Sequence, residues 1–272
     1  MEIELSTLLA LAMIALLAGF FDAIAGGGGL LTLPALFISG VDPLAAMATN
    51  KLQASSASVS AVWAFARKRM IRWRDGLPMA ALSFAGGVGG ALSISLVDKT
   101  ILQACAPVLL IAVAGYFALS PKLDEQERKR KVSTACFAAT VVPLIGFYDG
   151  IFGPGTGSFF MIAFTLLMGQ NILQAMSNSK LLNAACNLGA LSVFALSGSV
   201  IWPLALSMAA CAIIGAQAGA RCALYFGQRL IKPLLISVCG LMAIKLLLDD
   251  GNPIGEWLQQ NWVTYSNYWQ VN

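Results

Sequence analysis

The sequence of 272 residues contains no histidine, and charged side chains make up only 11% of it. The side chain that most often binds metals and transfers protons near neutral pH is therefore missing. The six cysteines do not replace it, because they lack the spacing of a metal site or of a secreted disulfide framework. We expect them to be buried apolar side chains, and we predict neither a metal nor a cofactor. They are Cys105, Cys136, Cys186, Cys211, Cys222 and Cys239.

Several enzyme motifs are also missing. The chain has no Gly-x-Ser-x-Gly nucleophile turn, no phosphate-binding loop and no metal-ligand triad. This disfavours hydrolases and ATP-driven pumps, and no catalytic residue is predicted. The net charge of +4 sits in loops, where it favours contact with the inner leaflet of a membrane over nucleic-acid binding.

Apolar residues are abundant instead, at 58% of the chain, whereas a soluble domain is roughly half apolar and a quarter charged. Windows close to the roughly 20 residues that cross a bilayer recur along the whole sequence. We therefore predict an all-α polytopic membrane protein that is embedded in the lipid bilayer. The windows are 8–21, 43–66, 77–97, 101–119, 133–147, 158–168, 173–197, 200–220 and 230–248.

The amino terminus does not have the charge pattern of a secretory signal. Glu2 and Glu4 precede the first apolar stretch without any base, although Ala23-Ile24-Ala25 resembles a cleavage site. We expect this segment to stay in the mature chain.

An internal repeat organises the sequence. Four landmarks recur in the same order. The matches are GFFDAIAGGGG at 19–29 with GFYDGIFGPGTG at 146–157, TNKL at 49–52 with NSKL at 178–181, Trp73 with Trp202, and GGVGGA at 86–91 with GAQAGA at 215–220. We predict a first transmembrane repeat at 1–120, a charged cytoplasmic linker at 121–132, a second repeat at 133–250 and an interfacial tail at 251–272.

Positive charge lies in different loops of the two halves. Between its second and third helices the first half carries Arg67, Lys68, Arg69, Arg72 and Arg74, whereas the matching loop, LSGSVIWP, carries no charge. One loop later the bases are in the second half, at Arg221, Arg229 and Lys232. Since cytoplasmic loops carry the excess of bases, the halves are predicted to be inverted, each a glycine-broken re-entrant segment plus three helices. A plain parallel arrangement of four plus four spans is the alternative.

The glycine breaks predict a cavity at membrane depth. Non-helical backbone is tolerated there only where protein or a water-filled space surrounds it. Helices restarting at Leu30 and Ser158 direct the positive ends of their dipoles toward one region, and Lys51 and Lys180 add formal charge. This combination favours a small anion.

We predict that the substrate-binding residues are the glycine turns, the two lysines and the neighbouring hydrogen-bonding side chains. They are Gly26, Gly27, Gly28, Gly29, Asn50, Lys51, Gln53, Gly153, Gly155, Thr156, Gly157, Ser158, Asn178, Ser179, Lys180, Asn183 and Asn187. Asp22 and Asp149 have two open roles. They either hold the turns and pair with the lysines, or they carry a proton that is coupled to transport.

Four segments resemble the TauE/SafE family of membrane permeases, also called sulfite exporters, and in particular its YfcA-like branch. They are GFFDAIAGGGGLLTLPAL, ATNKLQASS, GFYDGIFGPGTGSFF and SKLLNAACN, and the similarity covers about residues 8 to 250. The resemblance implies a bacterial inner-membrane transporter, an exporter of small sulfur-containing anions such as sulfite or organosulfonates. It also implies that Asn50-Lys51 and Ser179-Lys180 lie beside the substrate. Pro154 and Thr156 depart from the plain glycines of the first half and make the two half-sites unequal.

Two other classes of function compete with a carrier. An anion channel is one, although inverted halves with broken helices favour alternating access at a midplane site. An intramembrane aspartyl protease is the other, with Asp22 and Asp149 as its carboxylates, but the Gly-x-Gly-Asp setting of such enzymes is absent. The choice of anion, the direction of transport, the coupling ion and a homodimeric state stay open.

Overall fold

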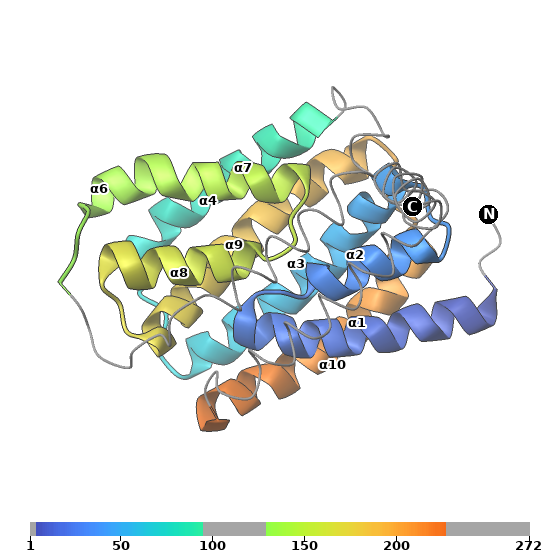
Figure 1. Ribbon diagram of the computed structural model, residues 1–272, viewed down its shortest axis with the longest axis horizontal. Coiled ribbons are helices and arrows are strands. Elements are labelled where there is room, and N and C mark those ends of the chain that lie inside the picture. The colour runs from blue at the N-terminus through green and yellow to red at the C-terminus, as the bar shows by residue number, and fades with distance from the viewer. Residues whose placement is uncertain (1–3, 95–128, 227–272) are drawn as a thin grey trace, which may run out of the picture.

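The computed structural model describes residues 4–94 and 129–226, and all regular structure in these two ranges is helical (Figure 1). The first range contains α1 (Leu5–Ala25), α2 (Gly29–Ile38), α3 (Pro43–Arg67) and α4 (Trp73–Ser93). The second contains α6 (Thr134–Cys136), η2 (Phe137–Val141), α7 (Val142–Ile151), α8 (Thr156–Met168), α9 (Ile172–Leu196) and α10 (Trp202–Phe226). The helices predicted at 101–119 and 230–248, most of the linker 121–132 and the tail 251–272 lie outside the described residues, as do Cys105 and Cys239.

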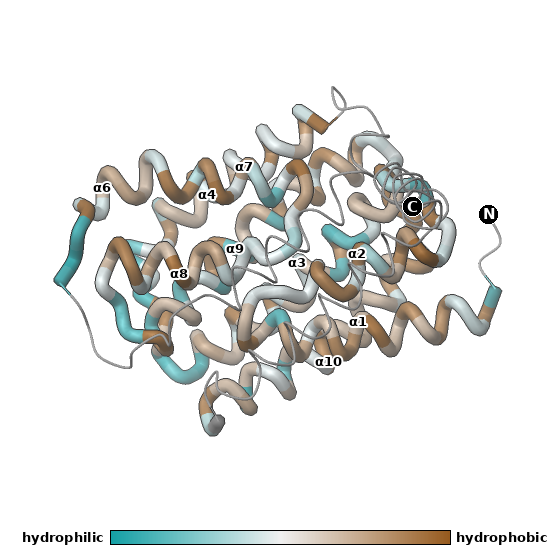
Figure 2. Tube along the Cα trace, viewed as in Figure 1, coloured by the Kyte–Doolittle hydropathy of each residue, from teal (hydrophilic) through white to brown (hydrophobic). Residues whose placement is uncertain are grey.

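Within those ranges, five helical segments are long and apolar enough to cross a membrane: α1, α4, the continuous segment Thr134–Ile151, α9 and α10. The prediction of an all-α polytopic membrane protein is confirmed. Leu5, Leu9, Met13 and Leu17 recur every fourth residue on α1 and are each more than half exposed, as expected for a face in contact with lipid. Figure 2 shows hydrophobic colour over most of the helices and hydrophilic colour mainly in connecting segments and in short interior stretches.

The glycine breaks produce two re-entrant hairpins. Helix α1 runs from one end of the bundle to its middle, where α2 turns back, and α7 reaches the middle from the opposite end, where α8 turns back (Figure 1). Both helices begin slightly earlier than predicted: α2 begins at Gly29 instead of Leu30, and α8 begins at Thr156 instead of Ser158. Glycine and threonine fit these first-turn positions, where no side chain has to pack against a preceding turn.

Helices α3 and α9 form the centre of the bundle and start at well-defined caps. The Asp42 carboxylate accepts the N–H of Leu44 at 3.1 Å before α3, and Asn171 accepts the N–H of Gln174 at 2.9 Å before α9. Helix α3 has 25 residues but is not among the five apolar spans, because serine, asparagine, glutamine and lysine interrupt its middle. Apart from the half-buried Ser56, these polar side chains are buried, and they bring polar groups to the middle of the molecule.

Matched glycines let matched helices pack closely. A Cβ atom on Gly90 of α4 would stand 2.1 Å from the carbonyl oxygen of Phe147 on α7. At the corresponding repeat positions, a Cβ on Gly219 of α10 would stand 2.2 Å from the carbonyl oxygen of Phe20 on α1. Helix α4 therefore packs on α7 as α10 packs on α1, with backbone against backbone.

The cysteines differ from the expectation in part. Cys186 is buried, Cys211 and Cys222 are half-buried, but Cys136 is exposed. Cys136 lies in the first turn of the helical segment that starts at Thr134, on its outward side, where a small apolar side chain can face lipid rather than the core.

Candidate functional site

The two glycine breaks touch each other in the middle of the bundle. Gly26 has a φ of 78°, in the left-handed region that favours glycine, and its N–H closes α1 by bonding to the carbonyl of Asp22 at 2.8 Å. A Cβ atom on Gly26 would lie 2.3 Å from the carbonyl carbon of Gly157 in the opposite break. The tips of the two hairpins are therefore in direct backbone contact, so the cavity predicted between the breaks is closed at this point in the present conformation.

Two buried ion pairs cross between the halves of the chain. Lys51 Nζ lies 2.9 Å from Asp149 Oδ2, and Lys180 Nζ lies 3.1 Å from Asp22 Oδ2. Each ammonium group also donates a hydrogen bond to the backbone carbonyl of the same aspartate. The exposed fraction of all four residues is 5% or less. Because an unpaired charge at this depth is costly, each lysine stabilises the break of the other half.

The two carboxylates have unequal surroundings. Asp22 Oδ1 accepts the N–H of Gly28 at 3.3 Å, at the cap of α2. Within the described ranges, Asp149 Oδ2 accepts no directed hydrogen bond, so its compensation comes from the nearby Lys51 ammonium. A Cβ on Gly153 would lie only 2.7 Å from Lys51 Nζ, which means that glycine provides the room the lysine needs. The half-sites are thus alike in layout but not in detail.

A chain of three polar side chains connects the two ion pairs. Asn187 Oδ1 lies 3.4 Å from Lys51 Nζ, and Asn187 Nδ2 donates to Asn183 Oδ1 at 3.1 Å. Asn183 Nδ2 donates to Ser58 Oγ at 3.0 Å, and Ser58 Oγ lies 3.4 Å from Asp22 Oδ2. All of these groups are buried. A change at one ion pair therefore alters the polar surroundings of the other.

This chain gives a first prediction. Replacing Asn187 by leucine keeps the volume but leaves Lys51 and Asn183 each short of a partner, so the free energy of unfolding should fall by about 1–3 kcal/mol. Ser192→Ala is the control, because Ser192 on the same helix donates to the carbonyl of Gly189 in the preceding turn and belongs to neither the ion pairs nor the polar chain. Thermal unfolding of the purified variants measures both. Equal melting temperatures for the two variants would show that the chain adds no stability.

Three predicted hydroxyl groups hold the breaks in place. Thr156 donates to the carbonyl of Gly153 at 2.7 Å, within its own break. Ser158 and Ser179 donate to backbone carbonyls of Ala25 and Gly157, so they fasten the first break to the second and the second break to α9. In this conformation these side chains are engaged with the protein itself.

The remaining predicted residues divide between the centre and one end of the bundle. Gly29 lies beside Pro154 of the other break, and Asn50 Oδ1 accepts the hydroxyl of Thr32. Gln53 is 1% exposed, and neither atom of its amide has a partner among the described residues. Asn178 lies apart from the breaks, where its amide donates to Gln170 Oε1 at 3.0 Å. Gly27 and Gly155 are turn positions: their carbonyls accept the N–H of Leu30 and of Ser158.

Two residues of the site were not predicted. Ser58 follows Lys51 by seven residues, as Asn187 follows Lys180, so the repeat alignment would have pointed to it. Tyr148, whose hydroxyl donates to the carbonyl of Pro154 at 2.7 Å, has no such signal, because phenylalanine occupies the matching position 21.

The comparisons with known proteins identify the family of the chain. A family model described as sulfite exporter TauE/SafE matches residues 11–246. The chain belongs to this family. Among its relatives, "Probable membrane transporter protein ORF9" of Sinorhizobium sp is 46% identical over 244 residues, which cover 90% of this chain and 94% of the relative. No solved structure matches the chain.

Two further relatives extend the comparison. "Probable membrane transporter protein YfcA" of Escherichia coli strain K12 is 44% identical over 249 residues, covering 91% of this chain and 93% of the relative. "Probable membrane transporter protein MJ0441" of Methanocaldococcus jannaschii is 24% identical over 269 residues, covering 91% and 99%. This TauE/SafE chain is therefore a multi-pass membrane transporter, as the motifs predicted.

Proposed function

We propose that this TauE/SafE protein is a secondary transporter that exports small anions, sulfite and organosulfonates among them, across the bacterial inner membrane by alternating access. The observation that carries the proposal is the crossed pair of lysine–aspartate contacts. Each joins a central lysine of one half to the glycine break of the other, at 2.9 Å and 3.1 Å. We place the substrate between the breaks, beside Lys51 and Lys180.

Matched contacts support an arrangement of two inverted repeats. The Lys51–Asp149 contact corresponds to Lys180–Asp22, and the backbone contact of α4 with α7 corresponds to that of α10 with α1. In Figure 1, α1 and α7 run in opposite directions, as do α3 and α9. Inverted repeats whose broken helices meet at the middle of the membrane are typical of transporters that alternate between two openings.

The crossed pairs provide a way to couple opening to binding. Since each pair bridges the two halves, moving one half relative to the other separates a lysine from its carboxylate. The separated ammonium group then needs a new negative partner, because an unpaired charge at this depth raises the free energy of the protein. A small oxyanion that enters between the breaks supplies that partner, and closing the opposite side returns the lysine to its aspartate.

Transport in reconstituted vesicles tests the proposal. Purified protein in proteoliposomes should take up labelled sulfite or methanesulfonate with saturation, and unlabelled anion on the far side should accelerate the exchange. A carrier carries no measurable single-channel current, whereas a channel does. Uptake that neither saturates nor exchanges, together with current in planar bilayers, would replace the carrier by a channel. Absence of flux for every small oxyanion tried would refute anion transport.

A further inference from the structure

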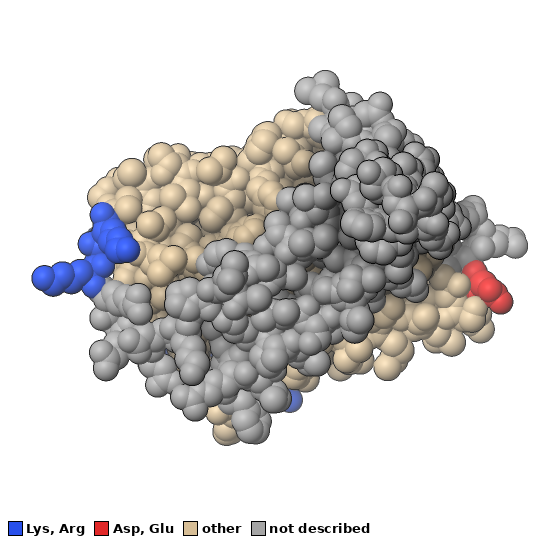
Figure 3. All heavy atoms as spheres, in the orientation of Figure 1, with Lys and Arg blue, Asp and Glu red and all other residues tan. Residues whose placement is uncertain are grey.

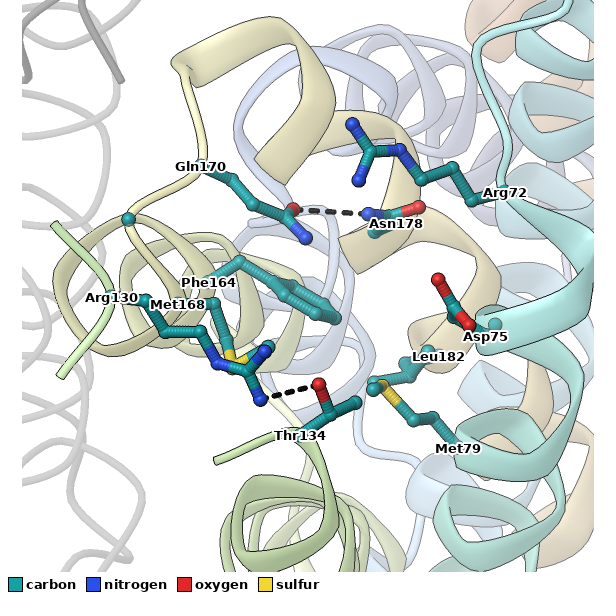
Figure 4. A pocket seen from close by; sticks show the side chains of 12 residues that line it. Arg72, Asp75, Met79, Arg130, Thr134, Phe164, Met168, Gln170, Asn178 and Leu182 are labelled. Atoms are coloured by element: carbon teal, nitrogen blue, oxygen red, sulfur yellow. Dashed lines mark hydrogen bonds between the residues drawn. The ribbon is translucent and has the colours of Figure 1, made fainter. Parts of the chain in front are cut away.

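A pocket of about 260 Å³ lies at one end of the bundle, between the beginnings of α4 and α9, the end of α8 and the segment that leads into α6. Figure 4 shows Arg72 and Asp75 on one side of this pocket and Arg130 across from them, with Asn178 and Gln170 between. Met79, Phe164 and Leu182 also line it. The pocket is large enough for a small oxyanion with several waters, at about 30 Å³ per water.

The polar groups of the pocket suit an anion. Two guanidinium groups and one carboxylate line the pocket, so its described lining carries a net positive charge. Asn178 is 6% exposed, and its Oδ1 has no partner among the described residues, while its Nδ2 donates to Gln170. Turning both amides over keeps their mutual hydrogen bond and leaves an N–H of Asn178 free to donate to a ligand.

The pocket opens at the end of the molecule where the bases gather. Figure 3 shows lysine and arginine side chains at this end and acidic side chains at the opposite end of the visible surface. The loop from α3 to α4 carries Lys68, Arg69 and Arg72, and Arg74 follows in the first turn of α4. An excess of bases marks the cytoplasmic side of a multi-pass protein. The pocket therefore faces the cytoplasm.

The repeat alignment supplies a second, independent observation. The matched tryptophans, Trp73 and Trp202, are 129 residues apart. With this offset, Arg72 matches Ile201 and Asp75 matches Leu204 in the second half. Asn178 matches Thr49 in the first half. At these matched positions the side chains are packed together or hydrogen-bonded to the backbone. Leu204 belongs to a buried apolar cluster, and Thr49 Oγ1 accepts the N–H of Ile201 at 3.1 Å. The other members of this cluster, here called the apolar seal, include Leu11, Leu36, Val41 and Met208.

We propose that the pocket is the cytoplasmic loading site for a small oxyanion such as a sulfonate, and that the apolar seal is the closed gate on the opposite side. The proposal rests on the proposed function. Arg72 and Arg130 attract the anion and Asn178 hydrogen-bonds it. Asn178 precedes Lys180 by two residues on α9, so the bound anion contacts the same helix that carries Lys180. The protein then has an entrance on one side and a dry barrier on the other.

Chemical labelling tests the loading site without relying on transport. In a variant whose native cysteines are replaced by alanine or serine, Asn178→Cys is exposed to two small methanethiosulfonate reagents, one carrying a sulfonate and one a trimethylammonium group. We expect reaction only from the cytoplasmic side of oriented vesicles, with the anionic reagent faster by about tenfold because a basic cleft concentrates anions. Arg72→Gln and Arg130→Gln together should remove the preference, and methanesulfonate should slow the labelling. Thr49→Cys, the position that matches Asn178 and lies against Ile201 beside the apolar seal, should stay unlabelled from both sides.

Labelling of the Asn178→Cys variant from the outside, or with no preference for the anionic reagent, would overturn the proposal. A transport assay separates this failure from failure of the proposed function. Arg72→Gln should raise the KM for methanesulfonate about tenfold with little change in maximal rate, as expected for loss of one charge-assisted hydrogen bond. Arg67→Gln is the control, because Arg67 stacks on Trp63 at the same end without lining the pocket. An unchanged KM in Arg72→Gln, with transport still lost in a well-folded double variant of Lys180→Met with Asp22→Asn, would refute the loading site and leave the proposed site between the breaks intact.

Discussion

Replacing Lys180 by methionine is expected to abolish anion transport and also to destabilise the protein. Methionine fills the volume of the lysine but leaves the Asp22 carboxylate without its ion pair, at a position that is 5% exposed. Removing one partner of a buried pair costs about 3–5 kcal/mol, because the other charge remains uncompensated. A loss of transport in this variant alone is therefore ambiguous, since poor folding would also produce it.

The double variant Lys180→Met with Asp22→Asn resolves the ambiguity. Its side chains carry no net charge at this position, and the asparagine Oδ1 can still accept the N–H of Gly28 that caps α2. We expect the melting temperature in detergent to return most of the way to that of the natural protein, while uptake into proteoliposomes stays absent. Lys68→Met, which removes an exposed lysine at the end of α3, should change neither quantity. Normal uptake by the double variant would mean that the lysine serves only the fold.

The layout of the fold could be predicted from the sequence because its signals are local. The length of the apolar stretches predicts the spans, and Asp42 and Asn171 are residue types that cap helices well. Glycine-rich stretches mark the breaks at Gly26 and Gly153. The matched motifs also indicate that the two breaks are equivalent. Each of these inferences depends on residues that are neighbours along the chain, so the docking of the halves does not affect it.

The pairing inside the site could not be predicted in the same way. Sequence places an acid and a base in each half, but it does not say whether Lys51 pairs with Asp22 of its own half or with Asp149 of the other. The answer depends on how the hairpins dock, and the structure has the crossed pairing. The hydrogen bonds by which Ser158 and Ser179 hold the breaks also depend on docking, because they are donated to the carbonyls of Ala25 and Gly157 on other segments.

A comparison of three glycines is expected to show that contact between the breaks, rather than turn geometry alone, holds the site together. Gly40 and Gly26 have nearly the same φ, at 76° and 78°, but a Cβ on Gly40 meets nothing within 4 Å. Gly40→Ala should therefore cost about 1–2 kcal/mol, the usual penalty of a left-handed alanine. Gly26→Ala should add a further ~1–3 kcal/mol or more, since its Cβ would lie 2.3 Å from the Gly157 carbonyl carbon.

Gly157→Ala tests the contact between the breaks without changing a left-handed turn. Gly157 is in a right-handed helix, so alanine is not strained there, but its Cβ would lie 2.6 Å from Gly26 Cα. We expect this variant to lose transport and to unfold at a lower temperature than Gly40→Ala, because the hairpin tips can no longer touch. Thermal unfolding and uptake into proteoliposomes measure the three variants under identical conditions. If Gly157→Ala transports normally while Gly26→Ala does not, the left-handed turn matters and the contact between the breaks does not; the substrate then has no reason to bind where the tips meet.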